Sequence, residues 1–260
     1  MSQDNLKSLV KAAAVLDCFS TVEQQLSVAE IAKRIGIPRG TANRIIRTLK
    51  ELGYLEQERQ RDQFRLGMKL FGLGNTVLAN MELQHEARST VEALTRVSGE
   101  TVHLAVFDGV HSTVINRTDA DGSSFNTRYV LEASPAHATS TGKAALAFQS
   151  PAEIERFISL GLRRFTEQTI VDPDHLRQEL QAIRERGYAF DDGELTDGVK
   201  CIGAPIHNSS GRVFAAISIS GISDEFTTKK IDLFSSLVVN HADLISSRLG
   251  YDPEIENVNK

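Results

Sequence analysis

Hydrophobic and polar positions near the N-terminus recur with the period of amphipathic helices. Apolar residues spaced three and four apart predict one helix over residues 6–19 and another that begins after Ser27. Ser27 and Glu30 match the capping-box pattern, in which each side chain accepts a hydrogen bond from the other residue's backbone amide. Gly36 then supplies a left-handed helix stop.

A further helix is predicted over residues 38–52, and its two faces differ. Pro38 suits the first helical position, and Gly53 suits the end. The face predicted to be buried is apolar and consists of Ala42, Ile45, Ile46, Leu49 and Leu52. The opposite face is predicted to be exposed and consists of Arg39, Gly40, Asn43, Arg44 and Arg47.

Two alternating runs follow, 54–57 and 63–66, and the polar tip between them predicts a β-hairpin. Helix, turn, helix and hairpin in this order are typical of a winged helix-turn-helix, which inserts its second helix into the major groove of DNA. Arginine pairs well with guanine, asparagine with adenine, and a hydroxyl near a helix start with phosphate. The predicted DNA contacts are Arg39, Thr41, Asn43, Arg44, Arg47, Arg59 and Arg61. The alternative is that this basic face is ordinary solvated surface.

Residues 68–81 predict a linker helix that is apolar on more than one side. Such a helix is expected to lie against a partner rather than to stand in water. A contact between two copies of the chain at this helix would set the spacing of their two recognition helices.

The rest of the chain, 82–260, predicts helices that alternate with hairpins. Hairpins outnumber parallel crossovers, so the expected fold class is α+β, with helices packed on a mainly antiparallel sheet. The predicted helices are 82–98, 141–149, 151–160, 173–186 and 225–249. The predicted strands are 100–107, 110–117, part of 123–137, 188–192, 199–206 and 212–220.

Charge is distributed unevenly along the 260 residues. Residues 1–80 hold 12 Lys and Arg against 8 Asp and Glu, whereas the remainder holds 17 against 26. A basic module suits contact with phosphate, and the length suits two domains. No stretch approaches the roughly 20 apolar residues of a membrane span, and the N-terminus lacks a secretion signal. Two distant cysteines fit a reducing compartment, so we expect a cytoplasmic protein with no membrane partner.

The best candidate for ligand chemistry is the start of the helix near residue 141. Thr139-Ser140-Thr141-Gly142 precedes that helix, so its backbone amides can bind a carboxylate. Ser218 and Ser220 share one face of a strand. The alternative is an ordinary helix cap beside a polar sheet face. The seven histidines show no metal-ligand spacing, so we expect neither a metal nor another cofactor.

Cys201 leaves two other functions open. It could be the nucleophile of an enzyme acting on small acids, with His103, His137 or His207 as base. It could instead be a redox sensor within a regulator. Nothing in the sequence places a base beside this thiol, and an enzyme does not need the basic N-terminal module.

Several motifs together resemble the IclR family of bacterial transcription regulators. In the N-terminal part these are Ile31-Ala32-Lys33-Arg34-Ile35-Gly36-Ile37-Pro38, Thr48-Leu49-Lys50-Glu51-Leu52-Gly53-Tyr54-Leu55 and Phe64-Arg65-Leu66-Gly67. In the C-terminal part they are His137-Ala138-Thr139-Ser140-Thr141-Gly142-Lys143-Ala144, Arg186-Gly187-Tyr188, Glu194, Cys201-Ile202-Gly203-Ala204-Pro205-Ile206 and Ala215-Ala216-Ile217-Ser218-Ile219-Ser220-Gly221.

The resemblance implies a winged helix-turn-helix over 1–67, a linker helix over 68–81 and a GAF-like effector-binding domain over 82–260. It implies dimers, or tetramers built from two dimers, on double-stranded operator DNA. It also implies a small carboxylic-acid effector bound by residues aligned with Ser140, Thr141, Asp191, Cys201, Ser218 and Ser220. We therefore expect a transcription regulator rather than an enzyme. An organic acid is expected to control its affinity for the operator, and a catabolic operon is the expected target by analogy with the family.

Two departures from the family pattern qualify these expectations. Ser134, Ser140 and Thr141 stand where the family often has small or apolar residues, so the effector is expected to be more hydroxylated than a simple 2-oxo acid. Gly40 replaces the serine that is usual early in the recognition helix, which leaves the operator sequence undefined.

Overall fold

The computed structural model describes the backbone of most of the chain, in two compact units, residues 1–80 and 81–260. The described residues are 6–20, 23–57, 63–79, 82–120, 124–126 and 132–252. Each unit is described below by itself.

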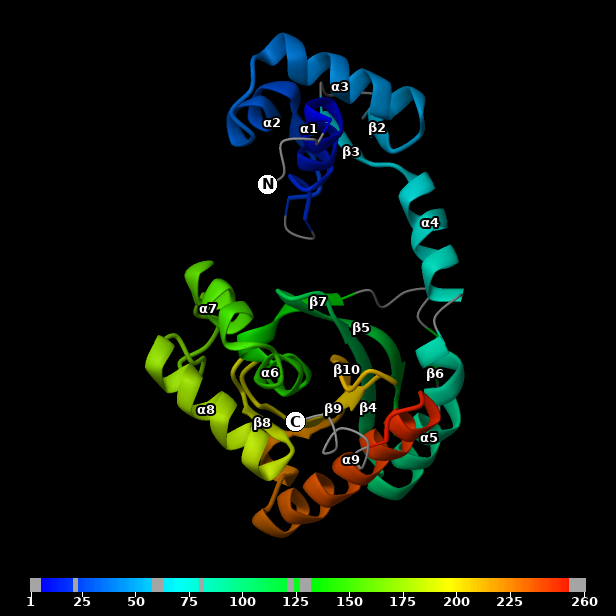
Figure 1. Ribbon diagram of the computed structural model, residues 1–260, viewed down its shortest axis with the longest axis vertical. Helices are drawn as coiled ribbons and strands as arrows, with labels where there is room; N and C mark the ends of the chain where they lie inside the picture. Colours follow the sequence, from blue (N-terminus) through cyan, green and yellow to red (C-terminus); the bar gives the residue numbers. More distant parts are fainter. Residues whose placement is uncertain are drawn as a thin grey trace. The chain divides into compact units, whose positions relative to one another are not determined.

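The N-terminal unit holds a helical cluster and a small antiparallel sheet (Figure 1). Its elements are α1 (Lys7–Leu16), β1 (Leu26–Ser27), α2 (Val28–Arg34), α3 (Arg39–Glu51), β2 (Leu55–Gln57), β3 (Gln63–Leu66) and α4 (Met68–Ala79). The strands pair in the order β1-β3-β2. Strand β1 was not predicted, because two residues are too few to show a strand period.

The predicted capping box at the start of α2 is confirmed. The Ser27 hydroxyl accepts from the Glu30 amide, and the Glu30 carboxylate accepts from the Ser27 amide at 2.8 Å. This cap directs the apolar face of α2 into a core shared with α1, α3 and the sheet. Val15, Ile31 and Ile46 are completely buried there.

Helix α3 differs from its prediction at both ends. Pro38 is the N-cap rather than the first helical residue. Leu52, predicted to be buried, is 52% exposed. The helix ends at Glu51 and the chain turns at Gly53, whose φ of 80° only glycine adopts readily, so the buried stripe stops at Leu49. Helix α1 likewise ends three residues before its predicted limit, at Leu16.

The C-terminal unit is built on an antiparallel sheet, which confirms the α+β fold class. Within the described residues seven strands pair in the order β6-β5-β4-β10-β9-β8, with β7 also paired to β5. The strands are β4 (Thr101–Phe107), β5 (His111–Thr118), β6 (Ser124–Asn126), β7 (Glu132–Pro135), β8 (Ala189–Asp192), β9 (Val199–His207) and β10 (Val213–Ile222). The helices are α5 (Glu82–Ser98), α6 (Ser140–Ala147), α7 (Pro151–Ser159), α8 (Pro173–Arg186) and α9 (Thr228–Arg248).

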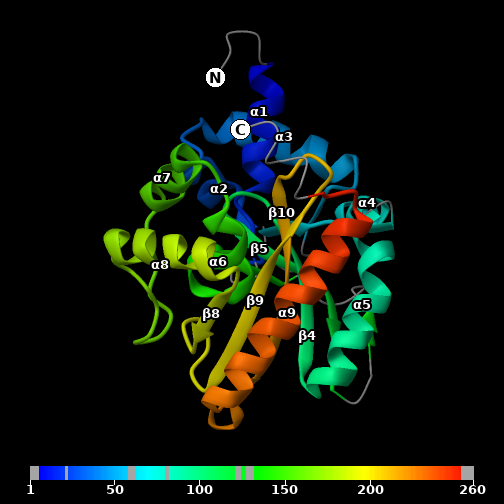
Figure 2. The same ribbon diagram turned by 60° about the horizontal axis from the view of Figure 1, so that its bottom comes forward.

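The two faces of this sheet have different coverings (Figure 2). Helices α5 and α9 pack on one face, which is apolar and consists of Val102, Leu104, Ile202, Ala204, Ile206, Ile217 and Ile219. Helix α6 packs on the opposite face, and α8 packs against α6. Because side chains alternate across a strand, the residues between these apolar ones point toward α6.

Two predicted boundaries in this unit were wrong. The described part of the range 123–137 contains two short strands and the beginning of the 3₁₀ turn Ala136–Ala138, where one strand and a loop were predicted. The C-terminal helix begins at Thr228 rather than near 225, because Ser223–Glu225 form a 3₁₀ turn. Thr227 is the N-cap, and its hydroxyl accepts a hydrogen bond from the Lys230 amide. None of the described helices has the length and apolar character needed to cross a bilayer.

Candidate ligand cavity and nucleic-acid interface

A cavity of about 200 Å³ lies between the start of α6 and the polar face of the sheet. The six predicted ligand residues all line it: Ser140, Thr141, Asp191, Cys201, Ser218 and Ser220. Four further polar residues contribute to the wall, namely His103, Ser134, Thr139 and Thr196. The apolar part of the wall consists of Val114, Leu195 and Val199.

The first turn of α6 supplies backbone donors to this cavity. The Thr139 hydroxyl caps the helix by accepting from the Gly142 amide at 3.1 Å, and the Thr139 carbonyl accepts from the Lys143 amide. The preceding amides, of Ser140 and Thr141, belong to the helix positions that lack an intrahelical acceptor. They lie at the positive end of the helix dipole, so this turn favours an anion.

Gly203 brings strand β9 directly against that turn. A β-carbon at this position would lie 2.8 Å from the Ser140 carbonyl carbon and 3.0 Å from the Thr141 nitrogen. Because any side chain would push α6 away, the glycine determines the distance between the helix amides and the sheet.

The strand register places the polar side chains in two adjacent rows. Asp191, Cys201 and Ser220 are cross-strand neighbours on β8, β9 and β10. Ser218 and His103 are cross-strand neighbours on β10 and β4, one row away. Cross-strand neighbours have β-carbons about 4.5–5.5 Å apart, so one small ligand can contact both rows.

Asp191 is buried, with 5% of its surface exposed. Its carboxylate accepts from the Glu194 amide at 2.7 Å. Burial raises the pKa of Asp191 to about 7, against the opposing effect of that amide. Near neutral pH this carboxyl group can therefore accept or donate a hydrogen bond.

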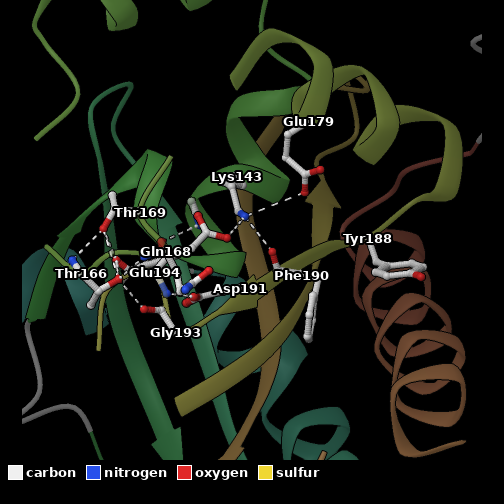
Figure 3. A network of polar contacts seen from close by, with 12 residues as sticks. Lys143, Thr166, Gln168, Thr169, Glu179, Tyr188, Phe190, Asp191, Gly193 and Glu194 are labelled. Atoms are coloured by element: carbon white, nitrogen blue, oxygen red, sulfur yellow. Dashed lines mark hydrogen bonds and ion pairs between the residues drawn. The ribbon is translucent and has the colours of Figure 1, made fainter. Parts of the chain in front are cut away.

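The buried ammonium of Lys143 anchors the chain on both sides of Asp191, at Phe190 and at Glu194 (Figure 3). It donates to the Phe190 carbonyl at 2.7 Å, forms an ion pair with Glu194, and lies 3.8 Å from Glu179. Hydroxyls outside the strand hold the same segment, since Thr169 donates to the Glu194 carbonyl at 2.6 Å. The positive charge of Lys143 is thereby balanced by Glu194, and Lys143 does not line the cavity.

Cys201 is held as a thiol. Burial raises the pKa of Cys201 to about 12, and the nearby Asp191 carboxylate adds to the effect. The Ser220 hydroxyl donates to Cys201 Sγ at 3.0 Å and contacts His103 Nδ1 at 3.1 Å. Ser220 therefore lies between the thiol and His103, and the scarcity of thiolate disfavours nucleophilic attack and oxidation.

The basic face of α3 is exposed to solvent. Arg39, Asn43, Arg44 and Arg47 are exposed, and Thr41 is half-buried near the start of the helix. Within the described residues the three arginines form no ion pair, whereas Arg34 on α2 forms a two-point pair with Glu23. The structure thus brings five of the predicted DNA contacts onto one helix. Arg59 and Arg61 lie outside the described residues.

Sequence reasoning did not place His103, Thr196 or the apolar residues Val114, Leu195 and Val199 in the cavity wall. Thr139 was part of the predicted carboxylate-binding turn, and it caps α6 and lines the cavity. His103 was considered only as a base for Cys201, because nothing short of the pairing of β4 with β10 places it beside Ser218. Among the described residues no group of three or more His, Cys, Asp and Glu side chains could hold a metal ion.

Two family models match the chain. The IclR helix-turn-helix domain matches residues 8–59, and the C-terminal domain of the bacterial transcriptional regulator IclR matches residues 75–247. The chain is 33% identical to the glycerol operon regulatory protein of Streptomyces coelicolor, over 84% of this chain and 85% of that protein.

Solved structures agree with these matches. The crystal structure of Thermotoga maritima IclR has a TM-score of 0.65 and 31% identity, covering 95% of this chain and 100% of that one. An IclR homologue from Microbacterium hydrocarbonoxydans, crystallised with 4-hydroxybenzoate, has a TM-score of 0.68 and 25% identity, covering 94% and 99%.

Proposed function

Because the chain belongs to the IclR family of bacterial transcriptional regulators, we propose that a small organic acid bound in the C-terminal cavity controls its affinity for operator DNA. Members of this family are DNA-binding regulators rather than enzymes. The acid, the contact residues and a catabolic target operon are the parts that we propose.

One observation carries the proposal: six polar residues from four separate elements surround a single cavity at the start of α6. The cavity wall contains no Lys or Arg among the described residues, so the first-turn amides are the donors suited to an anion. This arrangement supports the binding of one carboxylate.

The remaining wall indicates what else the ligand carries. Hydroxyls, a neutral thiol and the Asp191 carboxyl group offer hydrogen bonds to hydroxyl groups rather than to a second anion. A volume of about 200 Å³ is smaller than the roughly 300–1,000 Å³ of drug-sized pockets. These features favour a small monocarboxylic acid with at least one hydroxyl group.

A screen of carboxylic acids by thermal shift tests this function. A true effector at 100 times its dissociation constant should stabilise the protein by about 2.7 kcal/mol. Ser218→Ala should weaken that response and leave DNA affinity without effector nearly unchanged. Ser236→Ala, on the exposed side of α9, serves as the control. The proposal is wrong if no carboxylic acid changes either thermal stability or affinity for DNA.

The coupling between ligand and DNA is expected to be of ordinary allosteric size. An effector that favours one of two arrangements of the DNA-binding helices by ~1–3 kcal/mol changes operator affinity about 5- to 150-fold. Fluorescence anisotropy of a labelled operator, with and without the acid, measures this factor.

We further propose that α4 joins two copies of the chain into a dimer, which two such dimers can extend to a tetramer. Met68, Phe71 and Leu73 on this helix are 67%, 42% and 47% exposed. Apolar side chains on a linker helix lose this exposure when they pack on a second copy. Analytical ultracentrifugation of Phe71→Glu should show a smaller species than the wild type.

The rival proposal, redox sensing through Cys201, has a direct test. A sensor thiol needs a low pKa and access to solvent, whereas burial raises the pKa of Cys201 to about 12. The effector response of Cys201→Ser should therefore not change with added peroxide, and neither should that of the wild type.

A further inference from the structure

A hydrogen-bond chain crosses the floor of the cavity from Cys201 to His103. Ser220 lies at its centre, with Cys201 Sγ at 3.0 Å and His103 Nδ1 at 3.1 Å from its hydroxyl oxygen. The chain joins β9, β10 and β4, and all three side chains line the cavity.

The bond that Ser220 donates to Cys201 Sγ decides which nitrogen of His103 carries the hydrogen. Ser220 has a single hydroxyl hydrogen and donates it to Cys201 Sγ. Its contact with His103 therefore requires a hydrogen on Nδ1, which donates to the serine oxygen. Burial lowers the pKa of His103 to about 4, with the positive charge of Arg117 adding to the effect, so the imidazole is neutral at pH 7.

A neutral imidazole with its hydrogen on Nδ1 has a lone pair on Nε2. No hydrogen bond joins Nε2 to any described residue, and the ring lines the cavity. This atom accepts hydrogen bonds and cannot donate one. A ligand hydroxyl can donate a hydrogen bond to Nε2, whereas a keto oxygen has only lone pairs and would repel the lone pair of Nε2.

We propose that His103 is a specificity-determining residue, which selects hydroxy acids over the corresponding oxo acids by accepting the ligand hydroxyl on Nε2. The proposal rests on the acid-binding function proposed above and adds to it the chemical class of the second ligand group. Ser220 acts as a positioning residue, because its bond to Nδ1 determines which imidazole nitrogen keeps the lone pair.

Paired ligands test this selection. Isothermal titration of the full chain with lactate and glycerate should give dissociation constants at least about tenfold lower than with pyruvate. Asparagine places its amide near the Nδ1 position, so His103→Asn keeps a partner for Ser220, removes Nε2 and should abolish the preference. His103→Gln, whose amide reaches the Nε2 position, should restore part of it.

His85→Asn is the matched control, because its side chain is 89% exposed on α5, and it should keep the wild-type preference. A wild-type preference for pyruvate over lactate would overturn the proposal. So would an undiminished preference in His103→Asn.

A second measurement needs no ligand. The ¹⁵N spectrum of the imidazoles in the free full chain at pH 7, with the His103 signal assigned by its absence in His103→Asn, should show a neutral ring with hydrogen on Nδ1. Hydrogen on Nε2, or a doubly protonated ring, would overturn the proposal. If no carboxylate binds, the acid-binding function fails, and this spectrum still decides the acceptor role of His103.

Discussion

At Gly203 the absence of a side chain lets β9 meet the first turn of α6, and at Asp191 burial changes the proton equilibrium of a carboxyl group. These two residues lie on neighbouring strands of the same polar face. One determines the shape of the cavity, and the other determines its charge near neutral pH.

Gly203→Ala should reduce the free energy of unfolding by about 1–3 kcal/mol, because the new methyl group would overlap the Ser140 backbone. Urea unfolding followed by circular dichroism measures this change. Gly40→Ala is the control, since a β-carbon there meets no atom within 4 Å. Wild-type stability of Gly203→Ala would show that α6 and β9 can separate without cost.

The pKa of Asp191 predicts how stability depends on pH. Burial raises this pKa from 3.8 to about 7, so the folded state holds the proton more tightly than the unfolded state does. The resulting stabilisation is complete below about pH 4 and is lost as pH rises through 7. Asp191→Asn has no carboxyl to ionise.

Between pH 4 and pH 8 the unfolding free energy of Asp191→Asn should therefore increase relative to that of the wild type by up to about 4 kcal/mol. Thermal or urea unfolding across this range measures the difference. Asp192→Asn, at an exposed neighbouring position, should show little of it. Parallel pH profiles for Asp191→Asn and wild type would contradict the raised pKa.

At the scale of elements, α3 and α2 carry arginines in contrasting situations. Arg44 on α3 is exposed and forms no ion pair with any described residue, whereas Arg34 on α2 pairs with Glu23 and donates to the Cys18 carbonyl. The first is available to DNA, and the second stabilises the fold of its own unit.

Arg44→Ala should weaken operator binding by about 1–3 kcal/mol if it reads a guanine, and the loss should concentrate at one base pair. If Arg44 contacts phosphate instead, binding to every duplex should weaken equally. The slope of the logarithm of the binding constant against the logarithm of salt concentration should then decrease in magnitude by about 1. Arg34→Ala should change neither base preference nor salt dependence. Unchanged DNA affinity in Arg44→Ala would exclude α3 as the contact helix at this position.

At the scale of the whole molecule, the basic N-terminal unit and the acidic C-terminal unit have separate cores. A fragment that begins at residue 81 should therefore fold and bind the effector acid with an affinity close to that of the full chain. Titration calorimetry of the fragment tests this. An unfolded fragment would show that the C-terminal unit depends on residues 1–80.

Local patterns in the sequence were sufficient for most elements of both units. The capping box at Ser27 and the glycine stops at Gly36 and Gly53 were predicted, because each involves residues within one helix turn. The exposure of Leu52 and the presence of β1 were not predicted, because neither depends on local pattern alone. Whether a residue just beyond a helix is covered, or a two-residue strand forms, depends on partners far along the chain.

The sequence by itself determined most of the helices and strands, the two-part charge distribution and, through family motifs, six residues that line the cavity. Tertiary structure alone decided that His103 also lines the cavity, that Lys143 forms an ion pair with Glu194, and that the pKa of Asp191 is raised. Periodicity and caps act over a few residues and can be read from neighbours in the chain. Burial and cross-strand contact arise only when distant segments pack, and they determine which groups hold a proton and which face a ligand.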